Sequence, residues 1–134
     1  MDDIFVARLM TSPVETVHED ALVEDAANLM LEDGISSLVV VDDAGALAGI
    51  LTSTDFVRIV AERRPKDETP VSAYMTTDVT TAGAQDLVES AADAMIQGGF
   101  HHMPVVDDDD GVIGILSTTD LTAYVSGIQS PTPS

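Results

Sequence analysis

The sequence predicts an α+β protein built from two copies of one β-α-β-β-α repeat, packed about a pseudo-twofold axis. Two observations lead to this fold class. Within each half, apolar residues recur at helical spacing and then run continuously as in buried strands. The halves also repeat each other at one constant spacing, which is the signature of duplicated structure. The clearest pairs are Met10-Thr11 with Met75-Thr76, Val40–Asp43 with Val105–Asp108, and Gly49–Leu51 with Gly114–Leu116.

The first half begins with a predicted extended segment and helix. Leu22, Ala26 and Leu29 lie on one helical face, and Gly34 suits a left-handed C-cap. The β-branched run that follows is typical of a strand buried on both faces, and a turn then leads into a hairpin partner. Thr54 is the expected N-cap of the last helix. The expected elements are Val14–Thr16 extended, a helix over Ala21–Glu32, strands over Leu38–Val41 and Ala46–Leu51, and a helix over Thr54–Arg63.

The second half repeats this order of elements. A polar linker over 64–70 and a short helical turn over Val71–Met75 connect the halves, and Ile4–Met10 is the counterpart of that turn. We expect domain boundaries of 1–64 and 65–126, followed by a frayed tail over 127–134. The expected elements are Val79–Thr81 extended, a helix over Leu87–Gln97, strands over Met103–Val106 and Val112–Leu116, and a helix over Thr119–Val125.

The composition excludes several classes of protein. There is no cysteine among the 134 residues, so disulfides, thiolate zinc sites and cysteine nucleophiles are ruled out. No apolar run approaches the roughly 18 residues that a membrane-spanning helix needs. Hydrophobic residues make up 45% of the chain, which is enough for a core, although only 4% are aromatic. We therefore expect a soluble, cytoplasmic protein.

The net charge of −19 is the strongest compositional signal. Such a surface repels nucleic acids and anionic membranes. One interpretation is adaptation to molar salt, in which the Debye length falls to about 3 Å and self-repulsion is screened. The other is an acidic protein with an unusual partner.

Signals for catalysis and for metal binding are missing from the sequence. It has no Gly-x-Ser-x-Gly, Gly-x-Gly-x-x-Gly or phosphate-loop motif, so we expect no enzymatic activity. His101 and His102 are consecutive strand residues that point to opposite faces, and His18 is expected in a turn. Asp107–Asp110 lacks the alternating ligands of a calcium loop. We expect no metal site.

Two polar motifs mark the points where a strand meets a helix. The helix N-terminus carries unpaired N–H groups and partial positive charge, which suits a phosphate. Hydroxyl groups can donate to phosphate or ribose oxygens, and a carboxylate can accept from both hydroxyls of a ribose. The alternative is ordinary helix capping by the same residues. The motif residues are Thr52, Thr54 and Asp55 in the first half, and Ser117, Thr119 and Asp120 in the second.

The order of elements and these motifs resemble a tandem pair of cystathionine-β-synthase (CBS) domains, often called a Bateman module. The resemblance covers Ile4 to Val125, and the composition is similar to that of stand-alone pairs from halophilic archaea. The chain is also similar to the regulatory insert of IMP dehydrogenase, without its barrel. The resemblance implies ligand clefts between the two repeats, side-by-side homodimers and regulation of an unidentified protein. It implies AMP, ADP, ATP or S-adenosylmethionine as the regulatory ligand, with no catalytic cofactor.

The resemblance also implies which residues contact the adenine. They belong to the extended segment, the start of the buried strand and the following strand of each half. For the apolar members, core packing is the alternative. The implied residues are Thr16, Ser36, Ser37, Leu38 and Ile50 in the first half, and Thr81, His101, His102, Met103 and Ile115 in the second.

The two clefts are expected to be unequal. Arg58 follows Asp55 by one helical turn and could bind a phosphate, whereas Ala123 stands at the equivalent position of the second half. A surface ion pair is the alternative role for Arg58. The leading hypothesis is thus a ligand-sensing regulatory module. The alternative is a ligand-independent dimerisation or interaction protein with degenerate clefts.

Overall fold

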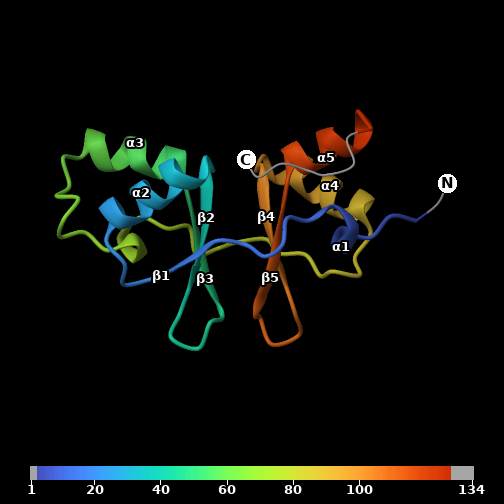
Figure 1. The fold of residues 1–134 in the computed structure, drawn as a ribbon, viewed down its shortest axis with the longest axis horizontal. Helices are drawn as coiled ribbons and strands as arrows, with labels where there is room; N and C mark the ends of the chain where they lie inside the picture. Colours follow the sequence, from blue (N-terminus) through green and yellow to red (C-terminus); the bar gives the residue numbers. More distant parts are fainter. Residues whose placement is uncertain (1–2, 128–134) are drawn as a thin grey trace. The chain divides into compact units, whose positions relative to one another are not determined.

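The computed structural model describes residues 3–127 and shows an α+β fold with two compact units (Figure 1). Residues Glu15–Val79 form the first unit. The second unit joins the N-terminal segment, up to Val14, to the residues from Thr80 onward. Within the described residues, no helix has the length and apolar character needed to cross a bilayer.

The first unit has a three-stranded mixed sheet in the order β1-β2-β3. β1 runs parallel to β2, and β2 runs antiparallel to β3 in a hairpin. The elements are β1 (Thr16–His18), α2 (Val23–Asp33), β2 (Ser37–Val41), β3 (Leu47–Thr52), α3 (Ser53–Ala61) and the 3-10 helix η1 (Val71–Ala73).

The second unit repeats this plan with small differences. Its hairpin is antiparallel, and Ala82 forms a single parallel bridge with Val105 in place of a full β1-like strand. Gly99 ends α4 in the left-handed conformation, as Gly34 ends α2, which confirms the glycine caps. The elements are α1 (Val6–Leu9), α4 (Val88–Gly98), β4 (His102–Val106), β5 (Val112–Ser117) and α5 (Thr118–Val125).

The N-terminal segment packs against the second repeat rather than the first. The Val6 N–H donates to the Asp86 carbonyl at 2.9 Å, and the Val88 N–H donates to the Ile4 carbonyl at 2.8 Å. The predicted boundaries of 1–64 and 65–126 follow the duplication. In the structure, the segment before the first repeat packs with the second unit, and the segment before the second repeat packs with the first unit. Most of the predicted tail, residues 128–134, lies outside the described part of the chain.

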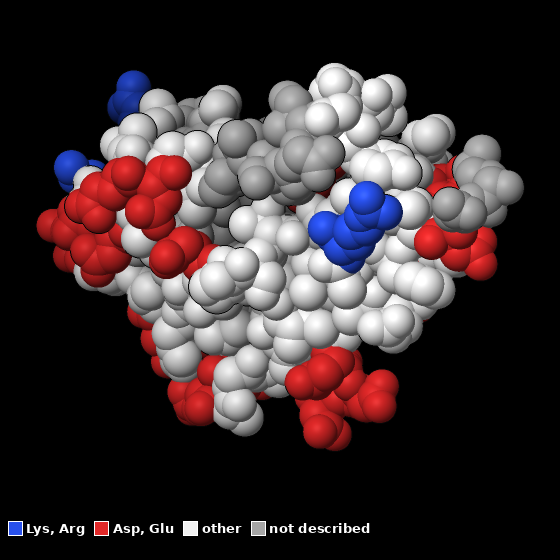
Figure 2. Space-filling view, turned by 45° about the vertical axis from the view of Figure 1, so that its right-hand side comes forward, with Lys and Arg blue, Asp and Glu red and all other residues white. Residues whose placement is uncertain are grey.

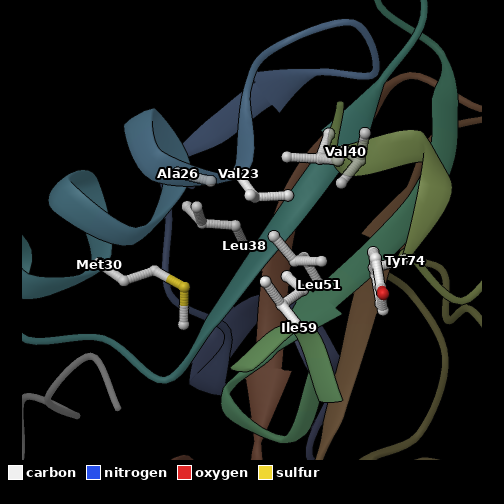
Figure 3. Close-up of a cluster of buried hydrophobic side chains, with 9 residues drawn as sticks. Val23, Ala26, Met30, Leu38, Val40, Leu51, Ile59 and Tyr74 are labelled. Carbon is white, nitrogen blue, oxygen red and sulfur yellow. The ribbon is translucent and has the colours of Figure 1, made fainter. Parts of the chain in front are cut away.

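Each unit has its own apolar core on the side of the sheet that the helices cover. In the first unit, Leu38 and Leu51 of the hairpin pack against Val23 of α2 and Ile59 of α3 (Figure 3). In the second unit, the core joins β4 and β5 to α4 and to residues of the N-terminal segment. Burying one such aliphatic side chain stabilises a fold by about 1.5–3 kcal/mol, so these contacts fix the helices on the sheet.

Two glycines let a further chain segment approach the third strand of each unit. The Ile50 N–H and C=O exchange hydrogen bonds with Thr76, at 3.0 and 2.9 Å. A β-carbon on Gly49 would lie 2.6 Å from the Thr76 carbonyl oxygen and 2.9 Å from the Met75 sulfur. The repeated Met-Thr and Gly-Ile-Leu motifs are thus two sides of one backbone pairing.

The second unit has the same pairing. Thr11 exchanges two backbone hydrogen bonds with Ile115, at 2.8 and 3.1 Å. A β-carbon on Gly114 would lie 2.7 Å from the Met10 sulfur. The residues that close the second unit therefore come from the N-terminal end of the sequence.

Gly49→Ala should destabilise the protein by about 1–3 kcal/mol, because the added methyl group overlaps the backbone of Thr76. Urea denaturation followed by circular dichroism measures this change. Gly83→Ala is the matched control, since its new methyl group would meet Asp86 Oδ1 at 3.4 Å, an ordinary contact. A Gly49→Ala protein as stable as wild type would contradict the close packing.

His18, at the end of β1, connects that strand to the β2–β3 turn. Its Nε2 lies 2.5 Å from Asp43 Oδ1, and its Nδ1 accepts a 3.1 Å hydrogen bond from the Asp20 N–H. The hydrogen bond with Asp43 is the main cause that raises the pKa of His18. His102 differs, because burial, aided by His101, lowers its pKa.

These opposite shifts predict opposite pH dependences. Protonated His18 stabilises the folded chain below its ordinary pKa, and this contribution is lost as pH rises through the raised pKa. The wild-type advantage in free energy of unfolding over His18→Gln should therefore shrink between about pH 6 and pH 8. The advantage over His102→Gln should instead shrink as pH falls below the ordinary histidine pKa of about 6.5, since a lowered pKa favours the neutral ring. Parallel curves for wild type and His18→Gln would refute the Asp43 contact.

Candidate functional site

The two strand–helix junctions have closely similar local structures. At the start of α3, the Thr52 N–H donates to Asp55 Oδ2 at 2.8 Å. At the start of α5, the Ser117 N–H donates to Asp120 Oδ2 at 2.9 Å, and the Asp120 N–H donates back to the Ser117 hydroxyl at 3.2 Å. Such reciprocal bonding satisfies the free N–H groups of a helix start. Each carboxylate therefore has one oxygen committed to the fold.

The predicted N-cap was wrong by two residues. Thr52 is the N-cap of α3, and Ser117 is the N-cap of α5. Thr54 and Thr119 therefore lie within the first turns of the helices, exposed and half-buried respectively. Asp55 and Asp120 are the third helical residues, where a carboxylate can reach back to the cap. The capping role offered as an alternative for the two aspartates is thus present.

The carboxylate of Asp120 is fully buried in the second unit. Besides its cap, it accepts a long hydrogen bond of 3.3 Å from the Thr11 hydroxyl. Burial raises the pKa of Asp120, although the bonds from Ser117 and Thr11 oppose this rise. A carboxylate in this setting gains from any further hydrogen-bond donor.

The carboxylate of Asp55 has a cation beside it instead. Asp55 Oδ1 lies 3.5 Å from the Arg58 guanidinium, which also lies over the ring of Tyr74, 5.5 Å from its centre. Arg64 stacks on the same ring at 5.5 Å, and the Tyr74 hydroxyl donates to Glu62 at 2.7 Å. More than half of the Arg58 side chain is exposed, so it can reach a ligand at the start of α3.

Among its described residues, the second unit lacks this arrangement at the junction, although Arg8 lies over the Tyr124 ring, 5.8 Å from its centre. The duplication aligns Ala123 with Arg58 and Leu9 with Tyr74. Thr11 and Tyr74 were not predicted as site residues. The repeated Met-Thr motif could have pointed to both residues, because Thr11 is part of it and Tyr74 directly precedes it. The backbone pairing of this motif with the third strand brings both residues to the junctions.

The start of the buried strand lies beside each junction. The Ser53 N–H donates to the Ser36 carbonyl at 3.1 Å, and the Thr118 N–H donates to the His101 carbonyl at 3.0 Å. Ser37 pairs with Thr52 across the first hairpin, and His102 pairs with Ser117 across the second. Three predicted polar residues thus adjoin at each junction, which are Ser36, Ser37 and Thr52 in the first unit and His101, His102 and Ser117 in the second.

The remaining predicted residues are placed less uniformly. Leu38 and Met103 belong to the two cores and are almost fully buried, so their side chains pack there. Ile50 and Ile115 lie outside both core clusters, on the opposite sheet face from Leu51 and Leu116. Thr16, which pairs with Val39, is exposed, as is Thr81.

His18, Asp20 and Asp43 form a group within the described residues that has the spacing of metal ligands. The His18 contacts described above already account for this arrangement, since Nδ1 accepts a backbone N–H and Nε2 faces a carboxylate. Asp20 and Asp43 are almost completely exposed.

Comparison with known proteins identifies this architecture. The pattern described as "CBS domain" matches residues 6–62 and again residues 71–127. The fold is similar to the crystal structure of the CBS domain pair of protein MJ0100 in complex with 5′-methylthioadenosine and S-adenosyl-L-methionine. That match has a TM-score of 0.86 and 28% identity, and covers 94% of this chain and 98% of that one.

Two proteins related in sequence differ in how much of their length this chain covers. A 17.7 kDa protein from Acidianus ambivalens is 34% identical over 116 residues, which are 87% of this chain and 70% of that protein. The homoserine O-acetyltransferase of Methanococcoides burtonii is 36% identical over 120 residues, or 90% of this chain. The chain spans only 24% of that enzyme's length. Two matched CBS regions, one in each repeat, show that the chain belongs to the CBS domain family as a tandem pair.

Proposed function

We propose that this chain is a non-catalytic regulatory module that binds an adenosyl ligand at its strand–helix junctions. AMP, ADP, ATP and S-adenosylmethionine are the candidate ligands. The main observation behind the proposal is the duplicated junction. In each unit, a helix start, hydroxyl groups and a carboxylate that accepts the N-cap N–H lie together. The similar CBS pair crystallised with methylthioadenosine and S-adenosylmethionine supports this ligand class.

The two carboxylates can bind a ribose while keeping their hydrogen bonds to the N-cap residues. Oδ2 of each aspartate accepts the N–H of its N-cap residue. Oδ1 has weaker partners, which are Thr11 at 3.3 Å in the second unit and Arg58 at 3.5 Å in the first. A ribose hydroxyl that replaced these contacts would satisfy the buried carboxylate with a shorter bond.

The two junctions should prefer different ligands. Arg58 gives the first unit a guanidinium for a phosphate group. Ala123 leaves the second junction without a guanidinium at the equivalent position, beside a carboxylate that burial already disfavours as an anion. We infer that the first unit takes phosphorylated nucleosides. The second takes an unphosphorylated or cationic ligand such as S-adenosylmethionine.

A second copy of this chain is the proposed assembly partner. The duplication aligns Leu31 of α2 with Ile96 of α4, and both side chains are more than three-quarters exposed. Equivalent helices of the two units thus present apolar residues at the same positions. Such residues mark protein interfaces, so a cytoplasmic homodimer that acts on a further, unidentified protein fits this surface. They also favour the alternative function, a ligand-independent interaction protein.

Adenosyl ligands should raise the unfolding temperature of the full chain, because they bind only the folded state. At a hundred times the dissociation constant the gain is about 2.7 kcal/mol. Asp55→Asn and Asp120→Asn keep an acceptor for the cap, and each should weaken binding about tenfold because a charge-assisted bond is lost. The readouts are thermal shift and titration calorimetry with AMP, ATP and S-adenosylmethionine.

Asp107→Asn is the matched control for these variants. Asp107 also accepts backbone N–H groups, from Asp109 and Gly111, but in the β4–β5 turn. Its replacement should leave ligand binding unchanged. No response to any ligand, from a chain that sediments as a dimer, would favour the ligand-independent interaction protein.

Arg58→Gln should weaken ATP binding about tenfold and leave S-adenosylmethionine binding unchanged, since only the triphosphate needs the guanidinium. Arg64→Gln is the control, because Arg64 stacks on the same Tyr74 ring and forms no ion pair with Asp55. Calorimetry should resolve one ATP site per chain. Two equal ATP sites, or equal effects of both arginine variants, would disprove the assignment.

A further inference from the structure

An open apolar groove lies on the second unit, between the start of α4 and the end of α5. Its volume is about 320 Å³. Residues of the N-terminal segment complete its wall. The lining residues are Asp3, Ile4, Leu87, Val88, Glu89, Ala92, Leu121, Tyr124 and Val125. None of the predicted ligand-binding residues is among them, so the groove is separate from the junctions.

The first unit shows what covers the equivalent surface there. Its linker passes over the start of α2, where the Glu24 N–H donates to the Lys66 carbonyl at 3.3 Å. The neighbouring bond from Val23 to Thr69, at 2.9 Å, has a counterpart in the second unit, from Val88 to Ile4. The Arg64 N–H donates to the Ile59 carbonyl at 3.1 Å, at the end of α3. A polypeptide segment therefore closes this surface in the first unit.

The lining residues of the second unit remain more accessible. Tyr124 is 42% exposed, whereas Ile59, its aligned partner, is 5% exposed. Leu87 is exposed, whereas its aligned partner Leu22 is half-buried; Val125 and its partner Val60 are both exposed. Exposed apolar side chains around one groove mark a binding surface. Because the duplicated backbone accepts a polypeptide at this place in the first unit, a polypeptide is the fitting occupant in the second.

The charge around the groove selects the chemistry of that polypeptide. Asp3 and Glu89 lie in its wall, and the whole chain carries a net charge of −19. Acidic side chains dominate the coloured surface in Figure 2. Tyr124 already attracts one guanidinium, that of Arg8, at 5.8 Å from the ring centre. An apolar segment flanked by lysine or arginine would complement both the floor and the rim.

We propose that this groove is a docking site for an apolar, basic-flanked segment of a partner protein. The site goes beyond adenosyl binding and does not depend on it. It supplies what a regulatory module needs in addition to a ligand site, which is a defined surface for another protein. The proposed homodimer contact uses Leu31 and Ile96, which do not line the groove, so the groove remains available to a partner protein.

The test uses the full chain and two labelled amphipathic peptides, one of leucine and lysine and one of leucine and glutamate. Fluorescence anisotropy should detect binding of the lysine peptide only. Val125→Glu should weaken this binding about tenfold, since it removes apolar contact area from the groove. Val60→Glu, at the aligned and equally exposed position of the first unit, should have no effect.

The Val125→Glu variant also separates docking from general charge attraction. Attraction to an acidic surface alone would become stronger when a negative charge is added. Unchanged or stronger binding by Val125→Glu would therefore overturn the proposal, as would equal binding of the glutamate peptide or no binding at all. Binding that appears only after residues 128–134 are deleted would also overturn it, because the chain itself would then be the occupant.

Discussion

The close approach of a Met-Thr segment to a glycine of the third strand is the constraint on which the structure depends. It occurs in both units, at Gly49 and at Gly114, and a side chain at either position would prevent it. The pairing brings Thr11 within hydrogen-bonding distance of Asp120. It also places Tyr74, next to Met75, under the Arg58 guanidinium. The polar environment of each junction follows from this one backbone contact.

The duplicated backbone has been kept while the side chains around it have diverged. In both units, a hydroxyl residue and a carboxylate cap the helix that follows the hairpin, α3 or α5, so the hydrogen-bonding pattern is the same. One carboxylate faces a cation, whereas the other is buried beside a threonine hydroxyl. Two sites of one geometry and different electrostatics can respond to different ligands, as a sensor of more than one metabolite would require.

Periodicity was sufficient to predict the helices, the hairpins and the glycine caps, because these depend on neighbours in sequence. It could not predict that the N-terminal segment packs with the second repeat, since identical motifs offer two possible partners. The N-cap position was missed because Thr52 and Thr54 are both good caps, and only the reach of Asp55 decides between them. Leu38 and Met103 remain predicted ligand contacts, and the structure places their side chains in the two apolar cores.

The most direct test of adenosyl binding at the junctions is an amide NMR titration of the full chain with S-adenosylmethionine and with AMP. Shifts are expected at Ser53 and Thr54 with AMP, and at Thr118 and Thr119 with S-adenosylmethionine. Amides of the two hairpin turns, such as Ala44 and Asp109, should remain unchanged. Shifts confined to the turns, or the absence of shifts at both helix starts under saturating ligand, would contradict adenosyl binding at the junctions.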